Sequence, residues 1–311
     1  MLVLTDMLKK HSTLVVCRKV VLMNYIDLHV HSNASDGTLS PTEVVELAAS
    51  LSLSAIALTD HDTLSGIEEA QAAALVVSSS ANPLRVIPGA EISVAYNNRD
   101  VHVLGLFLDT ENSLLKEALH TAILKRDERN EKMTANLRSA GIDITVEKLK
   151  ASEGEAVLTR AHFAKYMVEH RYTKTTKEAF DKYLNDSSPY YVPRDYLSPE
   201  KAISLIHQAG GLAVLAHPLL YKYNLEQLDE MIALFAEYGL DGIEAIYSMN
   251  TGFDEGIVRR FAGRYNLVIS GGSDFHGNNK PDIALGSGKG NLQIPEALLE
   301  PLENRLKTRP L

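Results

Sequence analysis

Short apolar runs rich in β-branched residues alternate with amphipathic segments from Tyr25 onward. This alternation is typical of strand–helix units whose strands pair in parallel and are buried, so it predicts an α/β fold with a parallel sheet or barrel. The expected strands are Tyr25–Val30, Ala55–Thr59, Arg85–Pro88, Val101–Phe107, Leu212–Ala216, Gly242–Ile246 and Leu267–Ser270. The expected helices between them are Pro41–Leu51, Gly66–Val77, Pro199–Gln208, Leu225–Tyr238 and Gly256–Tyr265.

The alternation stops between about residues 109 and 198, where helical patterns replace it. A long charged helix is expected over Asn112–Ala140, followed by shorter helices over Arg160–His170 and Thr175–Leu184. The charge run Lys125–Glu131 on the long helix is predicted to be a solvated face. We therefore expect a helical insertion domain at residues 111–196, set into one α/β domain that comprises residues 24–110 and 197–311.

Residues 1–23 lie outside this pattern. Charged residues interrupt their apolar patches, and the order of basic, apolar and small residues that marks a secretory signal is missing. We expect an upstream extension without a catalytic role, with Met23 as a candidate biological start.

Composition limits the possible partners and the compartment. The 31 Lys and Arg residues against 40 Asp and Glu residues give a net charge of −9, which opposes binding of long nucleic-acid duplexes through many phosphates. The single cysteine, Cys17, excludes an internal disulfide and any multi-cysteine metal site. No apolar run is long enough for a membrane span, so we expect a cytoplasmic protein. The sequence predicts no oligomeric state.

Six of the eleven histidines, together with three carboxylates, fall near the ends of expected strands. A lone strand histidine is more often half-buried structure than a ligand, and Asp36 before Gly37 would suit a turn. However, His29 and His31 alternate along one strand and so point to the same face. The full set of candidate ligands is His29, His31, Asp36, His61, Glu91, His102, His217, Asp274 and His276.

These nine side chains predict a multinuclear metal site. Residues at the carboxyl ends of barrel strands share one mouth, and six imidazoles gathered there without metal would make a poor core. Nine ligands suit three divalent cations that share a bridging carboxylate and a solvent molecule. Imidazole and carboxylate without thiolate favour Zn, Mn or Fe over Cu(I) and exclude a structural cysteine-type zinc site.

The segments DLHVHS, SDG, TDHDT, GAE, VHVLGL, AHP and GSDFHG together resemble the polymerase-and-histidinol-phosphatase (PHP) superfamily of metal-dependent phosphoesterases. The resemblance covers about residues 25–288 and implies a distorted (β/α)7 barrel of the TIM-like type. It also implies three ions with Glu91 as the bridge. One ion takes His29, His31, Glu91 and Asp274, a second takes Asp36, His61 and His276, and a third takes Glu91, His102 and His217.

Within the superfamily, the stretches Thr159–Ala164, Tyr191–Arg194 and Ala209–Pro218 are similar to the bacterial TrpH/YciV-like branch. That branch is associated with hydrolysis of phosphate from 3′,5′-nucleoside bisphosphates, AMP-like mononucleotides and short 5′-phosphorylated oligoribonucleotides. Arg160 and Arg194 would then bind substrate phosphate through their planar guanidinium groups. Either arginine alone would equally suit a surface salt bridge.

The expected reaction is hydrolysis by a metal-activated hydroxide, without a covalent intermediate. We predict that Asp36, His61, Glu91 and Asp274 are catalytic as well as metal ligands. Asp27, Asp60 and Asp62 are expected to fix histidine tautomers from outside the ligand set, although the last two would also suit helix caps.

Three rival functions remain open at this point. A histidinol-phosphate phosphatase would share the metal site, but the insertion and the Thr159-Arg160 stretch weigh against it. An amidohydrolase-type deacetylase or deaminase would use a carbamylated lysine, and no lysine ends an expected strand. A non-enzymatic metal- or nucleotide-binding regulator would be expected to lack some of the metal ligands, and the intact set of nine weighs against it.

Overall fold

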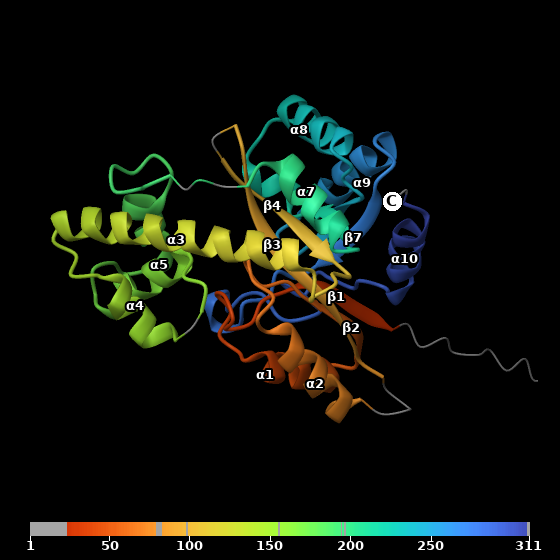
Figure 1. The fold of residues 1–311 in the computed structure, drawn as a ribbon, viewed down its shortest axis with the longest axis horizontal. Coiled ribbons are helices and arrows are strands. Elements are labelled where there is room, and N and C mark those ends of the chain that lie inside the picture. Colours follow the sequence, from red (N-terminus) through yellow and green to blue (C-terminus); the bar gives the residue numbers. More distant parts are fainter. Residues whose placement is uncertain are drawn as a thin grey trace, which may run out of the picture.

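The computed structural model describes residues 24–78, 83–97, 99–154, 156–193, 195 and 197–309. The expected N-terminal extension, the single cysteine and the predicted phosphate ligand Arg194 lie outside these residues. Seven strands follow one another in sequence order and curl into a nearly closed barrel (Figure 1). They are β1 (Tyr25–Val30), β2 (Leu53–Leu58), β3 (Arg85–Tyr96), β4 (Arg99–Leu106), β5 (Leu212–Leu215), β6 (Gly242–Tyr247) and β7 (Val268–Gly272).

The barrel is not fully parallel, which corrects the sequence expectation. Strands β1 to β3 are parallel to one another, as are β5 to β7, but β4 is antiparallel to both of its neighbours. The expected strand ended at Pro88. Strand β3 instead continues through Pro88 and Gly89 to Tyr96. Only two residues then separate β3 from β4, and a parallel crossover needs a dozen or more.

The barrel closes where β7 meets β1. The backbone N–H of Asp274 donates to the carbonyl of His29 at 2.9 Å, and the N–H of His31 donates to the carbonyl of Phe275 at 3.0 Å. Gly272 permits this approach, because a Cβ at that position would lie 2.2 Å from the Cβ of His29. The closure therefore places the end of β7 directly against the two histidines of β1 and its following loop.

Helices cover the outside of the barrel. They are α1 (Pro41–Ser50), α2 (Ile67–Val77), α7 (Pro199–Gln208), α8 (Leu225–Glu237), α9 (Asp254–Arg264) and α10 (Leu299–Thr308). Local chemistry sets their ends: Ser40 caps α1 in a capping box with Glu43, and Ser198 caps α7, whose bounds are those expected from the sequence. Helix α10 was not predicted, and it packs Leu299 and Leu302 into a core cluster with residues of the strands.

The segment between β4 and β5 is helical, and its first helix, α3 (Ser113–Ser139), is 27 residues long. The first half of α3 packs Leu115 and Leu119 into the barrel's outer core. Its second half packs Met133 and Leu137 into a separate core. The other members are α4 (Val146–Glu153), which was not predicted, α5 (Arg160–Glu169), α6 (Thr176–Ala179) and a π-helical turn, η1 (Phe180–Leu184).

Figure 1 shows α3 reaching from the barrel to α4 and α5. In packing terms the transition from barrel to insertion therefore falls inside α3, and the division at residues 110/111 and 196/197 stays a prediction. Of the residues described, none belongs to a helix with the length and apolar character that crossing a bilayer requires.

Candidate metal centre

The structure brings all nine predicted ligands to one mouth of the barrel. His29 lies in β1, Glu91 in β3 and His102 in β4. The other six lie in the segments that follow strands: His31 and Asp36 after β1, His61 after β2, His217 after β5, and Asp274 and His276 after β7.

We expected Glu91 and His102 near the ends of strands, but both lie inside their strands. Because β4 runs antiparallel, its amino-terminal part lies at the mouth, and His102 pairs with Ser93, two residues beyond Glu91. The hairpin of β3 and β4 continues past the site.

Glu91 lies at the middle of the cluster, and its two carboxylate oxygens face different histidines. Oε2 is 3.3 Å from His29 Nε2, 3.2 Å from His31 Nε2 and 3.2 Å from His61 Nδ1. Oε1 is 2.8 Å from His102 Nδ1 and 3.0 Å from His217 Nε2. The two oxygens of Glu91 therefore face separate groups of imidazole nitrogens.

The other two carboxylates extend the cluster to either side. Asp274 Oδ1 lies 3.6 Å from His31 Nε2 and 3.7 Å from His29 Nε2. Asp36 Oδ1 lies 3.1 Å from His276 Nε2, and Asp36 Oδ2 lies 3.7 Å from His61 Nε2.

Four overlapping groups have ligand atoms within 4.8 Å of one another, and each group could hold an ion. They are His31, Asp36, His61 and His276; His29, His31 and Asp274; His29, Glu91 and His217; and His61, Glu91 and His102.

The donor atoms fit divalent ions in two respects. Ligand atoms bonded at about 2.1 Å around a tetrahedral or octahedral ion lie roughly 3.0–3.4 Å apart, which is near the spacing of the atoms around Glu91. In addition, several buried donor atoms of the cluster have no hydrogen-bond partner among the described residues. These are His29 Nε2, both ring nitrogens of His31, Asp36 Oδ1, His61 Nδ1 and His217 Nδ1.

Glu244 orients two of the histidines, and sequence reasoning missed it. This fully buried carboxylate in β6 accepts from His29 Nδ1 at 3.0 Å and from the backbone N–H of His217 at 2.8 Å. His29 therefore presents Nε2 to the cluster. The signal in the sequence was a single acidic residue within the apolar strand Gly242–Tyr247.

The aspartates expected to fix histidine tautomers have other partners. Asp27 accepts from the backbone N–H groups of Ser273 and Gly286, each at 2.8 Å, so it ties the β7 region to β1. Asp60 accepts from the hydroxyls of Ser32 and Ser35, each at 2.6 Å. Both stabilise the backbone around the site rather than a histidine ring.

Burial and charge shift the pKa values of the cluster strongly. Burial alone would raise the pKa of Glu91, but His102, His61 and His29 outweigh it and hold that pKa well below its usual range. Burial lowers the pKa of His102, yet Glu91 and Asp100 raise it to about 10. The pKa of His31 is lowered by burial and by the neighbouring His276. Without ions, protons on histidine rings such as His102 therefore offset the negative charge of the carboxylates. Bound cations would replace these protons.

Two candidate ligands have left-handed backbone conformations. The φ angle is 28° at His217 and 60° at Asp274. Such angles are costly for residues other than glycine and persist where surrounding structure enforces them, which is common at functional sites.

A cavity of about 270 Å³ opens over the cluster, between the barrel and the insertion. Asp36, His61, His102 and His276 line its barrel side. Its insertion side carries four basic residues, Arg126, Arg129, Arg160 and Lys165. The insertion also reaches the ligand set directly, because Thr159 Oγ1 donates to Asp36 Oδ2 at 2.9 Å.

The basic residues of α3 correct the expectation of a solvated helix face. Arg126 and Arg129 are each only 5% exposed. Arg126 forms an ion pair with Asp62, beside the ligand His61, and its Nη2 lies 3.2 Å from Ser93 Oγ. The long charged helix therefore turns part of its charge inward, towards the cavity.

Arg160, one of the two predicted phosphate ligands, does line the cavity. It donates to Asp186 Oδ1 at 2.6 Å and to the carbonyl of Leu184 at 3.2 Å, and it lies 3.6 Å from Asp100. Its guanidinium also lies over the ring of Tyr191. Arg160 is thus held at the cavity wall by acidic and aromatic neighbours.

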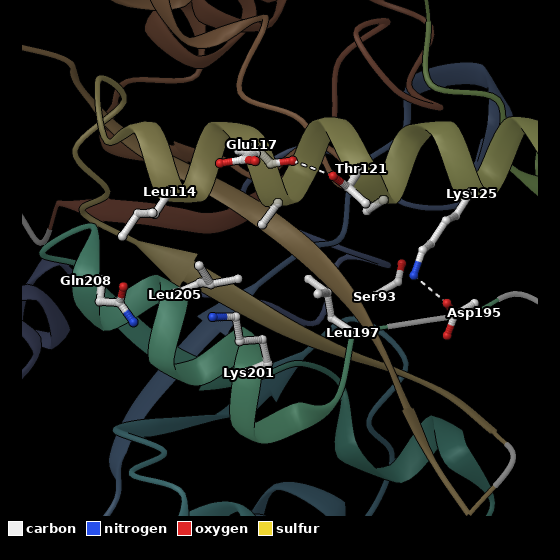
Figure 2. A pocket seen from close by; sticks show the side chains of 12 residues that line it. Ser93, Leu114, Glu117, Thr121, Lys125, Asp195, Leu197, Lys201, Leu205 and Gln208 are labelled. Carbon is white, nitrogen blue, oxygen red and sulfur yellow. Dashed lines mark hydrogen bonds and ion pairs between the residues drawn. The ribbon is translucent and has the colours of Figure 1, made fainter.

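A second cavity, of about 290 Å³, lies between α3 and α7 (Figure 2). Leu114, Leu197 and Leu205 form much of its lining, and the Lys125–Asp195 ion pair lies at one end. None of the nine candidate ligands lines it. The other cavity, which four of the candidate ligands line, is therefore the candidate reaction site.

Comparison with known proteins agrees with this geometry. The PHP domain family model matches residues 27–245. The 5′-3′ exoribonuclease Rnm of Escherichia coli is 34% identical over 80% of this chain and 84% of its own length. The 3′,5′-nucleoside bisphosphate phosphatase of Chromobacterium violaceum is 36% identical over 82% of this chain and 88% of its own length.

Among solved structures, a protein of Bifidobacterium adolescentis described as a candidate metal-dependent phosphoesterase superposes with a TM-score of 0.78. It is 30% identical, and the match covers 91% of this chain and 96% of that one. The chain belongs to the PHP family. It is accordingly a hydrolase of phosphoric ester bonds, and the barrel is of the distorted TIM type found in that family.

Proposed function

We propose that this protein hydrolyses phosphate esters of nucleotides with water activated by three divalent ions, Mn, Fe or Zn. The substrates proposed are 3′,5′-nucleoside bisphosphates, AMP-like mononucleotides and short 5′-phosphorylated oligoribonucleotides. The names of the relatives support this class of substrate. We further propose a cytoplasmic location, which the scarcity of cysteine favours.

One observation carries the proposal: candidate metal ligands of the barrel and basic residues of the insertion line the same cavity. Its volume of about 270 Å³ suits a small ester rather than a duplex. The non-bridging oxygens of a phosphate ester share its negative charge and point in different directions, so the basic residues and the ions can bind one substrate from two directions.

The nine clustered residues are proposed to hold the ions, with Glu91 as the bridge. His29, His31 and Asp274 complete one site, His102 and His217 another, and Asp36, His61 and His276 the third. The bound ions would supply a hydroxide at neutral pH and neutralise charge on the phosphoryl oxygens.

The chain's own residues then bind and orient the ester. Arg126, Arg129, Arg160 and Lys165 provide N–H donors for phosphate oxygens at the insertion side of the cavity. Thr159 fixes Asp36 through its hydroxyl, and Glu244 fixes His29. Arg194 stays a predicted phosphate ligand.

Phosphate release from a panel of esters tests the proposal. The panel contains adenosine 3′,5′-bisphosphate, AMP, a short 5′-phosphorylated RNA and histidinol phosphate, each with added Mn²⁺ and with chelator. We expect metal-dependent turnover of nucleotides and none of histidinol phosphate. Turnover of histidinol phosphate alone would contradict the nucleotide assignment. His217→Ala is expected to abolish turnover, and unchanged hydrolysis by that variant would contradict the proposed ion site.

A further inference from the structure

Lys280 is a basic residue of the cavity that comes from the barrel rather than the insertion. It directly follows the short turn η3 (Gly277–Asn279), which itself follows the ligands at the end of β7. Asn279 Nδ2 donates to the backbone carbonyl of Asp36 at 2.8 Å, and the N–H of Lys280 donates to the carbonyl of Gly277 at 3.1 Å. The backbone that carries Lys280 is therefore tied to the metal-binding loops.

The ammonium of Lys280 contacts a candidate ligand. Its Nζ donates to Asp274 Oδ2 at 2.6 Å, and the hydroxyl of Tyr247 donates to the same oxygen at 2.8 Å. The other oxygen, Oδ1, faces His29 and His31. Lys280 and Tyr247 thus hold Asp274 so that Oδ1 faces the histidines of the cluster and Oδ2 faces Lys280 and Tyr247.

The same ammonium has donors beyond this bond. A lysine carries three N–H donors, and among the described residues the hydrogen-bond acceptor of Lys280 Nζ is Asp274. The side chain is 38% exposed and lines the cavity. A lysine ammonium ordinarily carries a positive charge at neutral pH.

We propose that Lys280 is a catalytic residue that donates a hydrogen bond to a non-bridging oxygen of the phosphoryl group under attack, while it also holds Asp274. This inference rests on the proposed function. In the hydrolysis, a water oxygen forms a bond to phosphorus and the ester P–O bond breaks. The attacking water gives up a proton and the leaving oxygen takes one up, so the step balances with the water alone and Lys280 keeps its own protons.

The position of Lys280 assigns it to the reacting phosphate rather than to the rest of the substrate. It lies within one hydrogen bond of a candidate metal ligand, whereas Arg126, Arg129, Arg160 and Lys165 come from helices α3 and α5 of the insertion. Negative charge on the non-bridging oxygens is shared with the attacking and leaving groups in the transition state, so a fixed cation there acts mainly on kcat.

The test compares Lys280→Met and Lys280→Arg with Lys289→Met. Lys289 is an exposed lysine of the same connecting segment and does not line the cavity. For Lys280→Met we expect kcat to fall about 100-fold, with KM raised no more than about tenfold. Lys280→Arg should recover part of the loss, and Lys289→Met should match the wild type.

Two further measurements separate catalysis from support of Asp274. Metal content by mass spectrometry should be unchanged in Lys280→Met, and inorganic phosphate should bind the ion-loaded variant about tenfold more weakly by calorimetry. A metal content that falls in step with kcat, or an unchanged kcat, would overturn the proposal. If the wild type hydrolyses no ester of the panel, the proposed function fails, and equal phosphate binding by the wild type and Lys280→Met would then overturn this inference as well.

Discussion

The barrel and the helical insertion meet at one cavity but bring different chemistry to it. The barrel supplies every candidate ligand, including three carboxylates. The insertion supplies Arg126, Arg129, Arg160 and Lys165. Strand register and tight loops hold the ligands, whereas the cations extend from two helices, α3 and α5. The comparison predicts that the proposed metal centre of the barrel and the basic residues of the insertion can be disrupted separately.

The largest effect is expected from removing the bridge on the barrel side. Glu91→Gln removes the negative charge that faces five histidines and replaces one oxygen with an NH2 group. Bound metal should therefore fall, and phosphate release should slow at least about 1,000-fold, equivalent to several kcal/mol of lost transition-state stabilisation. Metal content and phosphate release check this. Glu117→Gln, an exposed position on α3, is the control. A Glu91→Gln variant that keeps its ions would disprove the bridging role.

Barrel closure gives the next largest effect, on stability. The Cβ added in Gly272→Ala would overlap His29, and forcing the two strands apart should cost about 3 kcal/mol in the free energy of unfolding. Urea unfolding of the metal-free protein measures it. Gly263→Ala in α9, where an added Cβ meets nothing within 4 Å, should instead stabilise by about 0.5–1 kcal/mol. Equal unfolding midpoints for the two variants would contradict the overlap.

On the insertion side we expect loss of substrate binding without loss of metal. Arg129→Gln removes a charged donor from the cavity wall, so KM should rise about tenfold while metal content stays constant. Steady-state kinetics with metal analysis checks this prediction. Lys132→Gln, exposed on the same helix, should behave as the wild type. A drop in metal content for Arg129→Gln would mean that the two regions are not separable.

The smallest expected effect is on the pH dependence of metal binding. The pKa of His102 in the cluster without ions is raised to about 10, so the ring is protonated on both nitrogens throughout the neutral range. One of these two protons must leave before the ring can bind a cation. Lower pH favours the protonated, ion-free form, so affinity should fall by about tenfold per pH unit for each proton displaced. Calorimetry in two buffers of different ionisation enthalpy counts these protons. His102→Asn should release about one fewer, and equal release would contradict the prediction.

The clustering of most candidate ligands could be predicted from the sequence because the information is local. His29 and His31 alternate along a strand, and His61, His217, Asp274 and His276 closely follow apolar runs, so a strand assignment is enough to bring them to one end of a barrel. The bounds of β1 and α7 were likewise predicted correctly, because apolar runs and capping residues define them.

Other residues of the site carried no local signal. Glu244 looks like a lone acidic residue in a buried strand, and only the fold places it against His29. Arg126 and Arg129 belong to a charge run that reads as solvent-exposed, but α3 lies across the barrel mouth and buries them. Their environment depends on residues more than thirty positions away, such as Asp62.

The sequence by itself determined the strand–helix order, the break in it and the kinds of donor atoms available. Only the tertiary structure decided the antiparallel direction of β4, the meeting of five histidines around Glu91, and the inward face of α3. The physical reason is that periodicity and capping act over a few residues, whereas strand direction and side-chain environment are set by contacts between segments far apart in the chain.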